Sequence, residues 1–181
     1  MPRDTVPSHA DIVRLLRDSG AVRFGTFTLA SGATSDVYVD IKRVWTEPKN
    51  LQPIARALAQ QVGEAARLAG MELGAVPLVV AVALETGRPY AVVRKAAKTH
   101  GTQHRIEGEV PPGERVLVVE DVTTSGGSVV ETVELLRSAG AVVTDVVTVV
   151  DREAGARDRL AALGIRLTAL ATLGELRSGP A

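Results

Sequence analysis

The sequence predicts a single α/β domain with a mostly parallel central sheet flanked by helices. Runs rich in β-branched residues, such as RVLVVED and AVVTDVVTVVD, alternate with amphipathic helical segments along most of the chain. Continuous apolar strands are typical of parallel sheets that are covered by helices on both faces. The length of 181 residues also favours one domain over two.

The first helix is predicted over residues 10–18, because Ser8 and Asp11 form an S-x-x-D start signal and Gly20 follows as a stop. Residues 24–44 contain two alternating runs joined by a polar Ser/Gly turn, which predicts a pair of short strands.

The rest of the chain alternates between helices and strands. Pro48 suits the first turn of a helix, and the residues after it continue that helix. Val129, Val133 and Leu136 share one helical face, which indicates a helix that ends at Gly140. The predicted elements are helices over 48–68, 76–85, 126–140 and 155–164, a weak strand at Leu68 and Ala69, and strands over 90–95, 115–121, 141–151 and 165–170. Residues 95–113 lack a period, and so long a loop is usually functional or disordered.

Composition limits the function. Lys plus Arg equals Asp plus Glu, at 21 each, which argues against a general nucleic-acid surface. The absence of cysteine excludes disulfides, thiolate catalysis and cysteine-ligated metals. The stretch MPRDTVPSHADIV lacks the apolar run of a signal peptide, and GAVPLVVAVAL is too short to span a bilayer. We therefore expect a soluble cytoplasmic protein with no nucleic-acid or membrane partner.

The stretch VVEDVTTSGGSVVETVELL places two acids and a run of small residues where a strand gives way to a helix. Ligands of open α/β sheets bind outside the carboxyl ends of the strands, and helix N-termini suit phosphate. The amides of residues 123–128 can wrap a phosphate closely. Glu120 and Asp121 would repel that phosphate, so they need sugar hydroxyls or a magnesium ion. A ribose 5-phosphate satisfies both halves, whereas a plain turn with an N-cap is the simpler alternative.

These residues resemble a known family. The run VLVVEDVTTSGGS is similar to the phosphoribosyl pyrophosphate (PRPP) signature of type I phosphoribosyltransferases, whereas neither a Walker loop nor a G-x-G-x-x-G turn is present here. Together with FTLASGATSDVYVD, RKAAKTHG followed by IEGE, and VVDREAG, it resembles the orotate phosphoribosyltransferases from Phe24 to about Leu176.

The resemblance implies a type I phosphoribosyltransferase fold in one domain, residues 1–181. Residues 1–45 would form the N-terminal helix and a small hood, and residues 46–181 the α/β core with a mobile loop, 95–113. It also implies a magnesium-dependent pentosyltransferase that transfers ribose 5-phosphate from PRPP to orotate. The products would be orotidine 5′-monophosphate and pyrophosphate, in de novo pyrimidine (UMP) biosynthesis. A homodimer with shared active sites is implied as well.

Site residues follow from the same resemblance. Lys98 and Asp121 would be catalytic, and Thr124 and Arg152 would contact orotate. No protein side chain is assigned as a metal ligand, although Mg²⁺ is the expected cofactor. The residues expected to bind PRPP are Arg94, Lys95, Lys98, His100, Glu120, Asp121, Val122, Thr123, Thr124, Ser125, Gly126, Gly127 and Ser128.

Physical chemistry supports the basic residues of this set. The leaving pyrophosphate gains negative charge, so cations that meet it on loop closure stabilise the transition state most. A planar guanidinium such as that of Arg152 pairs bidentately with the carboxylate of orotate. The simpler alternatives are a solvated charged loop and a surface Arg152 paired with Asp151 or Glu153.

The chain departs from the family pattern at some positions. Glu120 replaces the first acid of an Asp-Asp pair, and Ala30 stands where many members have a lysine that reaches PRPP. Glu72 could act through magnesium or point away, and His104 has no motif partner. The rival functions are a purine phosphoribosyltransferase and a PRPP-sensing regulator; the hood and Arg152 argue against the first, and the balanced charge argues against the second.

Overall fold

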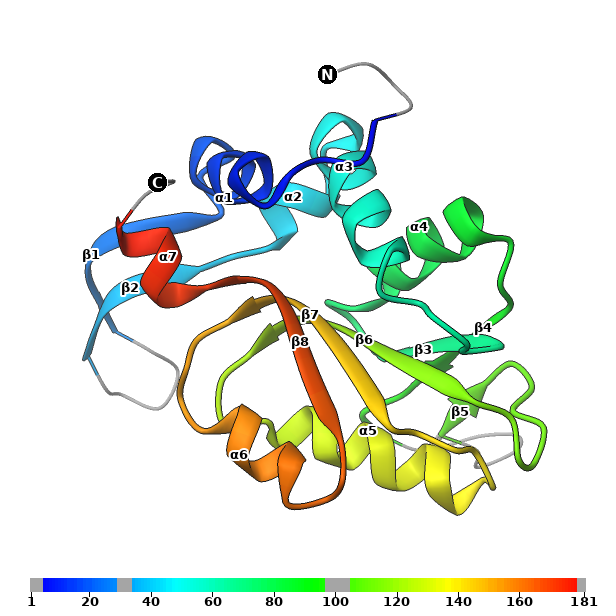
Figure 1. The fold of residues 1–181 in the computed structure, drawn as a ribbon. Helices are drawn as coiled ribbons and strands as arrows, with labels where there is room; N and C mark the ends of the chain where they lie inside the picture. The colour runs from blue at the N-terminus through cyan, green and yellow to red at the C-terminus, as the bar shows by residue number, and fades with distance from the viewer. Residues whose placement is uncertain (1–4, 29–33, 97–104, 179–181) are drawn as a thin grey trace.

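The computed structural model describes residues 5–28, 34–96 and 105–178. Within these ranges the strands form a six-stranded sheet in the order β5-β4-β3-β6-β7-β8 and a separate two-stranded sheet, β1-β2 (Figure 1). The strands are β1 (Val22–Thr28), β2 (Thr34–Val39), β3 (Arg67–Met71), β4 (Tyr90–Val93), β5 (Ile106–Glu107), β6 (Val116–Thr123), β7 (Asp145–Asp151) and β8 (Arg166–Thr172).

Neighbouring strands of the large sheet run parallel, except that the short β5 pairs antiparallel with β4. The helices are α1 (His9–Asp18), α2 (Lys42–Trp45), α3 (Pro48–Ala59), α4 (Val76–Thr86), α5 (Gly127–Ser138), α6 (Ala156–Ala161) and α7 (Leu173–Ser178). The predicted α/β fold with a mostly parallel, helix-flanked sheet is confirmed.

Two apolar clusters cover the two faces of the sheet. Helices α3 and α4 lie on one face and α5 and α6 on the other (Figure 1). In β6, Val119 belongs to the α3–α4 cluster and Val118 to the α5–α6 cluster, because successive side chains of a strand point to opposite faces. Burial on both sides explains why β6 and β7 are continuous apolar runs rather than alternating ones.

The structure contains the predicted start signal of α1 and the predicted stop signal of α5. Ser8 Oγ accepts a hydrogen bond from the Asp11 amide (3.2 Å), and the Asp11 carboxylate accepts one from the Ser8 amide (3.1 Å), which completes the capping box of α1. In α5, Val129, Val133 and Leu136 are fully buried, and Gly140 has a positive φ of 96° just beyond the helix end.

The prediction for residues 48–68 is wrong in its second half. The helix α3 ends at Ala59, and Gly63 then adopts a left-handed φ of 53° before β3 begins at Arg67. The weak strand is in fact the central β3, buried along its whole length. Gly70 interrupts its apolar run because a Cβ there would meet Ala75 Cβ at 2.7 Å. Close packing of α4 on the sheet therefore requires the residue that weakened the strand signal.

Several other strands and helices also differ from the predicted boundaries. Strand β6 continues to Thr123, two residues beyond its predicted end, so Glu120 and Asp121 lie inside the strand and Glu120 is opposite Thr148 of β7. Strand β7 begins at Asp145 instead of residue 141. The short strand β5 lies within the segment expected to be a loop, and α2 and α7 had no sequence-based expectation.

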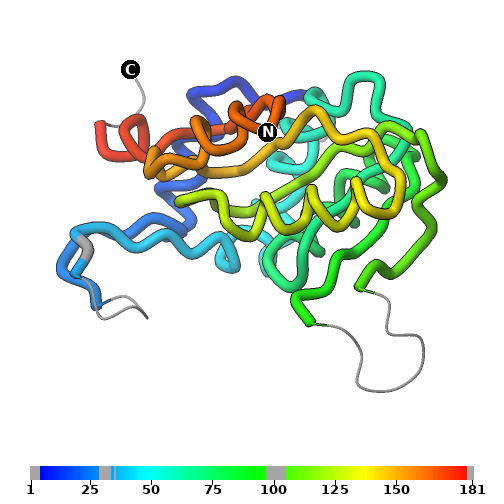
Figure 2. The backbone as a smooth tube through the Cα atoms, turned by 90° about the horizontal axis from the view of Figure 1, so that it is seen from below, coloured from blue at the N-terminus to red at the C-terminus, as the bar shows by residue number. Residues whose placement is uncertain are grey.

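Strands β1 and β2 form an antiparallel hairpin, which we call the hood. It projects from the body of the molecule (Figure 2) and lies on the side to which the carboxyl ends of β6, β7 and β8 point (Figure 1). The guanidinium of Arg23 lies over the rings of Phe27 and Tyr38, at 5.6 and 5.2 Å from their centroids. An ion pair of 2.6 Å between Arg177 and Asp36 ties α7 to the hood.

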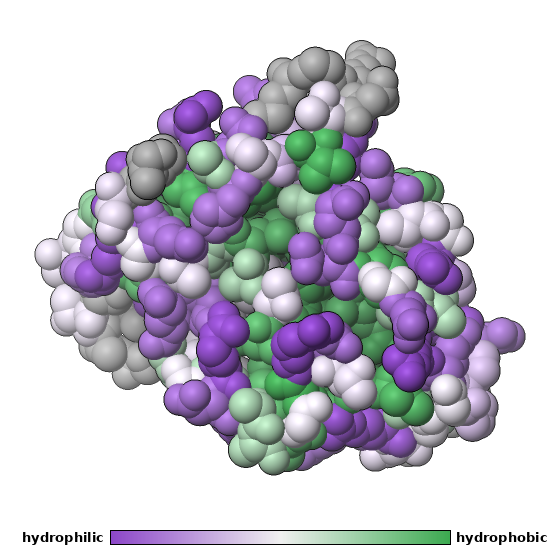
Figure 3. Space-filling model, viewed as in Figure 1, coloured by the Kyte–Doolittle hydropathy of each residue, from purple (hydrophilic) through white to green (hydrophobic). Residues whose placement is uncertain are grey.

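In the view of Figure 3, hydrophilic side chains cover most of the visible surface, and hydrophobic side chains are seen mainly in the gaps between them. Among the helices in the described ranges, none has the length and apolar character needed to cross a membrane.

Candidate active site

A cavity of about 310 Å³ opens at the carboxyl ends of β3 and β6. It collects residues from four separate parts of the chain: the segment after the hood, the end of β3 with the β3–α4 loop, the segment after β4, and the end of β6 with the start of α5. This is the position at which open α/β sheets bind ligands. Its lining residues are Lys42, Met71, Glu72, Leu73, Gly74, Lys95, Glu120, Asp121, Val122 and Ser128.

The two acids differ in their surroundings. The Glu120 side chain is 6% exposed, and its Oε1 accepts a hydrogen bond from the Asp121 amide at 2.9 Å. Asp121 is half-buried, and its Oδ1 accepts one from the Val122 amide at 2.7 Å. Burial raises the pKa of the Glu120 carboxyl group well above its usual range, and the adjacent Asp121 raises it further. These surroundings therefore favour the protonated form of Glu120 more than water does.

The small-residue loop, residues 123–128, is packed against its surroundings, but several of its hydroxyl groups have no hydrogen-bond partner within the described residues. Gly126 is the N-cap of α5 with a φ of 77°, and no side chain caps the helix. Within the described residues, the side chains of Thr124, Ser125 and Ser128 make no hydrogen bond. No hydroxyl of this loop caps α5, so the turn-plus-N-cap alternative does not account for these side chains, which stay available to a ligand.

The loop is held from outside by the start of α6. The Thr124 carbonyl accepts a hydrogen bond from the Ala156 amide (3.2 Å), and a Cβ on Gly126 would lie 3.3 Å from Ala156 Cα. Thr123 is buried, and its hydroxyl donates to Asp151 Oδ1 at 3.3 Å. The backbone is therefore held in place, and the first amides of α5 have no capping side chain, which suits an anion.

Arg94 and Lys95 follow β4, and Lys95 lines the cavity. Glu72 lies between them: its Oε2 is 3.7 Å from Arg94 Nε, and its Oε1 accepts a hydrogen bond from the Lys95 amide at 3.0 Å. Arg94 Nη1 is also 3.7 Å from Glu107. Glu72, whose role the sequence left open, thus contacts Arg94 and Lys95. Lys98, His100 and His104 lie outside the described residues, as does Ala30.

Two functional candidates had no sequence signal. Arg105 donates hydrogen bonds to the carbonyls of Arg94 and Lys95 and to Glu131 of α5, each at 2.7 Å. It therefore fixes both ends of the segment that contains Lys98. Lys42, the first residue of α2, is exposed and lines the same cavity as the acid pair. Only the folded chain brings Lys42 there, since it is far from the other lining residues in sequence.

Arg152 follows β7 beside the small-residue loop, where its amide donates to the Thr123 carbonyl at 2.9 Å. Within the described part of the chain its guanidinium forms no ion pair. Asp151 instead contacts Thr123 and Arg157 (3.5 Å). The alternative of a surface Arg152 paired with a neighbouring acid does not hold.

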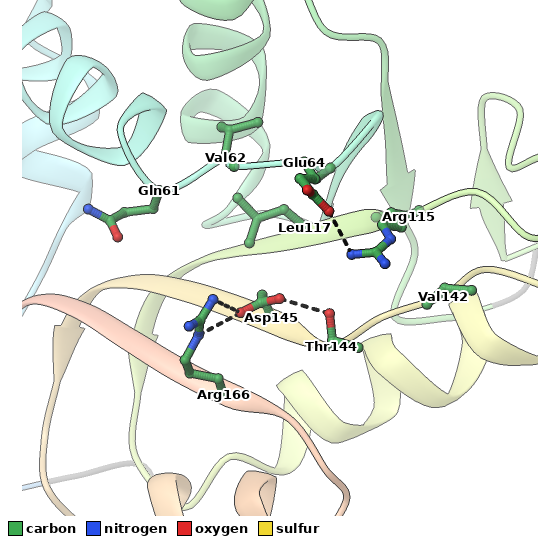
Figure 4. A pocket seen from close by; sticks show the side chains of 12 residues that line it. Gln61, Val62, Glu64, Arg115, Leu117, Val142, Thr144, Asp145 and Arg166 are labelled. Atoms are coloured by element: carbon green, nitrogen blue, oxygen red, sulfur yellow. Dashed lines mark hydrogen bonds and ion pairs between the residues drawn. The ribbon is translucent and has the colours of Figure 1, made fainter.

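A second cavity, of about 270 Å³, lies at the opposite edge of the sheet, at the amino ends of β6, β7 and β8 (Figure 4). Its charged groups pair with one another: Arg115 with Glu64 at 3.1 Å, and Arg166 with Asp145 at 2.6 Å. Because both arginines that line this cavity are already paired with acids, it offers no free cation among its lining residues and is poorly suited to phosphate.

An α/β sheet with a hood, an acid pair and an open anion loop at the end of β6 defines a class of protein, the phosphoribosyltransferases. A model of the phosphoribosyl transferase domain matches residues 40–163. Orotate phosphoribosyltransferases of Methanoculleus marisnigri and Natronomonas pharaonis are 54% and 49% identical to this chain. Each alignment covers 93% of this chain, and 98% and 97% of those proteins respectively.

The crystal structure of orotate phosphoribosyltransferase from Mycobacterium tuberculosis in complex with PRPP superposes with a TM-score of 0.78 at 34% identity. It covers 94% of this chain and 99% of that one. The chain belongs to the orotate phosphoribosyltransferase family.

Proposed function

We propose that this protein transfers the ribose 5-phosphate group of PRPP to orotate, releasing pyrophosphate and forming orotidine 5′-monophosphate in pyrimidine biosynthesis. One observation carries the proposal: the acid pair, Glu120 and Asp121, and the unsatisfied loop 123–128 lie side by side at one cavity that also holds Lys42 and Lys95. A sugar phosphate with a second anionic group is the ligand that needs all three features.

The 5-phosphate of PRPP binds the amides and hydroxyls of residues 123–128, with the partial positive charge at the start of α5 behind them. The ribose hydroxyls bind Glu120 and Asp121. A protonated Glu120 donates to one hydroxyl oxygen, whereas a carboxylate accepts from a hydroxyl. Asp121 contacts the reacting sugar and stabilises the positive charge that develops at C1 as the bond to pyrophosphate breaks.

Pyrophosphate leaves toward the basic side of the cavity. Lys42 and Lys95 line that cavity, and Arg94 lies next to Lys95. Lys98 and His100 belong to the segment that Arg105 holds at its ends, and we assign the principal catalytic role to Lys98. Cations that approach on closure offset the charge of the leaving group and exclude water, which would otherwise hydrolyse the activated sugar.

Orotate binds between the small-residue loop and the hood. Its carboxylate pairs with the free guanidinium of Arg152, and Thr124 supplies a hydroxyl to the ring. The hood lies on the side to which the carboxyl ends of β6 and β7 point, and Thr124 and Arg152 directly follow these two strands. The base nitrogen then attacks C1 of the ribose as pyrophosphate leaves, and positioning and electrostatics accelerate the step without a covalent enzyme intermediate.

Magnesium fits this site if it binds together with PRPP rather than in a metal site built from protein side chains alone. Among the described residues no group of three or more His, Asp and Glu side chains converges as a metal cage. Mg²⁺ usually keeps several waters and binds one or two carboxylates together with substrate phosphates. Asp121 is the side chain most available to it, and the bound ion would neutralise pyrophosphate oxygens.

We further propose that the enzyme is a cytoplasmic homodimer in which the loop of one subunit completes the site of the other. Arg105 holds the ends of that loop beside β4 and β5, the two strands at one edge of the sheet, which supports a loop that reaches outward from the subunit. The whole chain would act as one domain, with residues 1–45 as helix and hood and residues 46–181 as the core.

An assay of base specificity tests the proposal. The protein is mixed with PRPP, Mg²⁺ and orotate, and the loss of the ultraviolet absorbance of orotate is followed. We expect turnover with orotate and none with adenine or hypoxanthine. Turnover with a purine alone would assign the chain to the purine branch, and tight oligonucleotide binding without turnover would indicate a regulator.

A further inference from the structure

Glu153, the residue after Arg152, has an unusual backbone. In the described part of the chain it is the only non-glycine residue with a positive φ, at 56°. Such strained positions persist only where the surroundings fix them, and they gather at functional sites. Here the Glu153 amide donates to Asp151 Oδ1 at 2.9 Å, which holds the turn on the side of Asp151.

The carboxylate of Glu153 is bound by the start of α7, and in the described part of the chain it forms no ion pair with its neighbour Arg152. Its Oε2 accepts a hydrogen bond from the backbone amide of Gly174, at 2.8 Å, in the first turn of α7. A Cβ at position 174 would lie 3.0 Å from the same Oε2, so a glycine there lets the carboxylate approach closely.

The other acid beside Arg152 is engaged as well. Asp151 is 2% exposed, and its oxygens contact the Thr123 hydroxyl, the Glu153 amide and Arg157. Arg152 is therefore flanked by two carboxylates in sequence, and both have other partners. In solution a flexible arginine next to two acids would pair with one of them part of the time, and an external carboxylate would have to displace it.

We propose that the Glu153–Gly174 contact sequesters the Glu153 carboxylate and so keeps the guanidinium of Arg152 available to the carboxylate of the substrate. Glu153 is then a positioning residue, which acts on orotate affinity through Arg152. The inference rests on the proposed contact between Arg152 and orotate. It also gives α7 a role, since Arg177 of that helix pairs with Asp36 of the hood and so connects both sides of the base site.

Two nearly isosteric variants test the proposal. Glu153→Asp and Glu153→Asn both tolerate a positive φ and are both one methylene too short to keep the Gly174 contact. Only Glu153→Asp retains a free carboxylate next to Arg152. We expect the KM for orotate to rise about three- to fivefold in Glu153→Asp, the scale of a partly exposed ion pair that must be displaced. Glu153→Asn should stay near the wild-type value, and the KM for PRPP should not change in either.

A second variant releases Glu153 without altering it. Gly174→Pro removes the amide donor at a first-turn position that tolerates proline, and Gly174→Ala keeps that donor. We expect Gly174→Pro to raise the KM for orotate more than Gly174→Ala, and Glu153→Gln in the Gly174→Pro background to restore it. Equal values for Glu153→Asp and Glu153→Asn, or no rescue by Glu153→Gln, would overturn the proposal.

Arg152→Ala separates this inference from the function on which it rests. It should raise the KM for orotate by itself, and adding Glu153→Asp should then have no further effect. If Arg152→Ala leaves that KM unchanged, the assignment of Arg152 to orotate is wrong. If Arg152→Ala raises it but the Asp and Asn variants behave alike, only the sequestration by Gly174 is wrong.

Discussion

The carboxylate of Asp121 lies directly against Gly74. A Cβ built on Gly74 would stand 2.6 Å from Asp121 Cγ, closer than real side chains approach. Asp121 belongs to β6 and Gly74 to the loop between β3 and α4, so the contact joins the two strands whose ends form the cavity. The absence of a side chain at position 74 is therefore what allows Asp121 to occupy its place.

Gly74→Ala should displace the Asp121 carboxylate without straining the backbone, because Gly74 has no positive φ. A displacement of this kind costs up to about a hundredfold in rate when it moves a group at the reacting atoms. We expect kcat/KM to fall at least about tenfold while the thermal unfolding midpoint stays close to that of the wild type. Steady-state kinetics and a melting curve check this, and wild-type kinetics in the variant would contradict it.

The buried Glu120 makes stability depend on pH. Burial, with Asp121 as the second cause, raises the pKa of Glu120 in the folded protein above its ordinary value of 4.5. Between those two values the folded state binds more protons than the unfolded state, so the stabilisation present below pH 4.5 is lost as the pH rises toward the folded pKa.

Glu120→Gln removes this titration. The free energy of unfolding of the wild type minus that of Glu120→Gln should fall as the pH rises above 4.5, at a slope of at most about 1.4 kcal/mol per pH unit. Chemical denaturation without ligands, repeated at several pH values, measures the difference. A difference that is constant or rises with pH would show that Glu120 is not held protonated by its surroundings.

Lys42 should contribute to PRPP binding, in place of the lysine that Ala30 does not supply. Lys42→Ala should raise the KM for PRPP about tenfold, the scale of one charge-assisted hydrogen bond, and Lys42→Arg should restore most of the affinity. Lys49→Ala is the matched control, since Lys49 is exposed on α3 and does not line the cavity. Equal effects of the two alanine variants would refute the role of Lys42.

Mixing inactive variants tests whether two subunits share a site. Lys98→Ala and Asp121→Ala should each be inactive, but a heterodimer of the two has one site with both residues intact. We expect about a quarter of wild-type activity after random exchange at equal concentrations. Glu120→Ala mixed with Asp121→Ala is the control, because both changes fall on the same side of the site. No recovery despite confirmed subunit exchange would argue against sharing.

The sequence predicted those features that local patterns determine. The spacing of Val129, Val133 and Leu136 identified the buried face of α5, and the acids before the small residues pointed to the end of β6 where the cavity opens. Burial on both faces also explains the continuous apolar run of β6. Each of these follows from residues that are neighbours in the chain.

The features it missed depend on distant parts of the chain. Strand β3 looked weak because Gly70 is required for contact with α4, and its central position depends on pairing with β4 and β6. Gly74, Lys42 and Arg105 reach the site only through folding. The proposed availability of the Arg152 guanidinium depends on the contact between Glu153 and Gly174, and no local sequence pattern connects Gly174 with Arg152.

The central claim is that the acid pair holds the ribose of PRPP while residues 123–128 hold its 5-phosphate. A crystal structure of the protein with PRPP and Mg²⁺ tests it most directly. We predict the 5-phosphate within hydrogen-bond distance of the amides of residues 123–128, and the ribose hydroxyls within reach of Glu120 and Asp121. A ligand bound elsewhere, with that loop empty, would contradict the account.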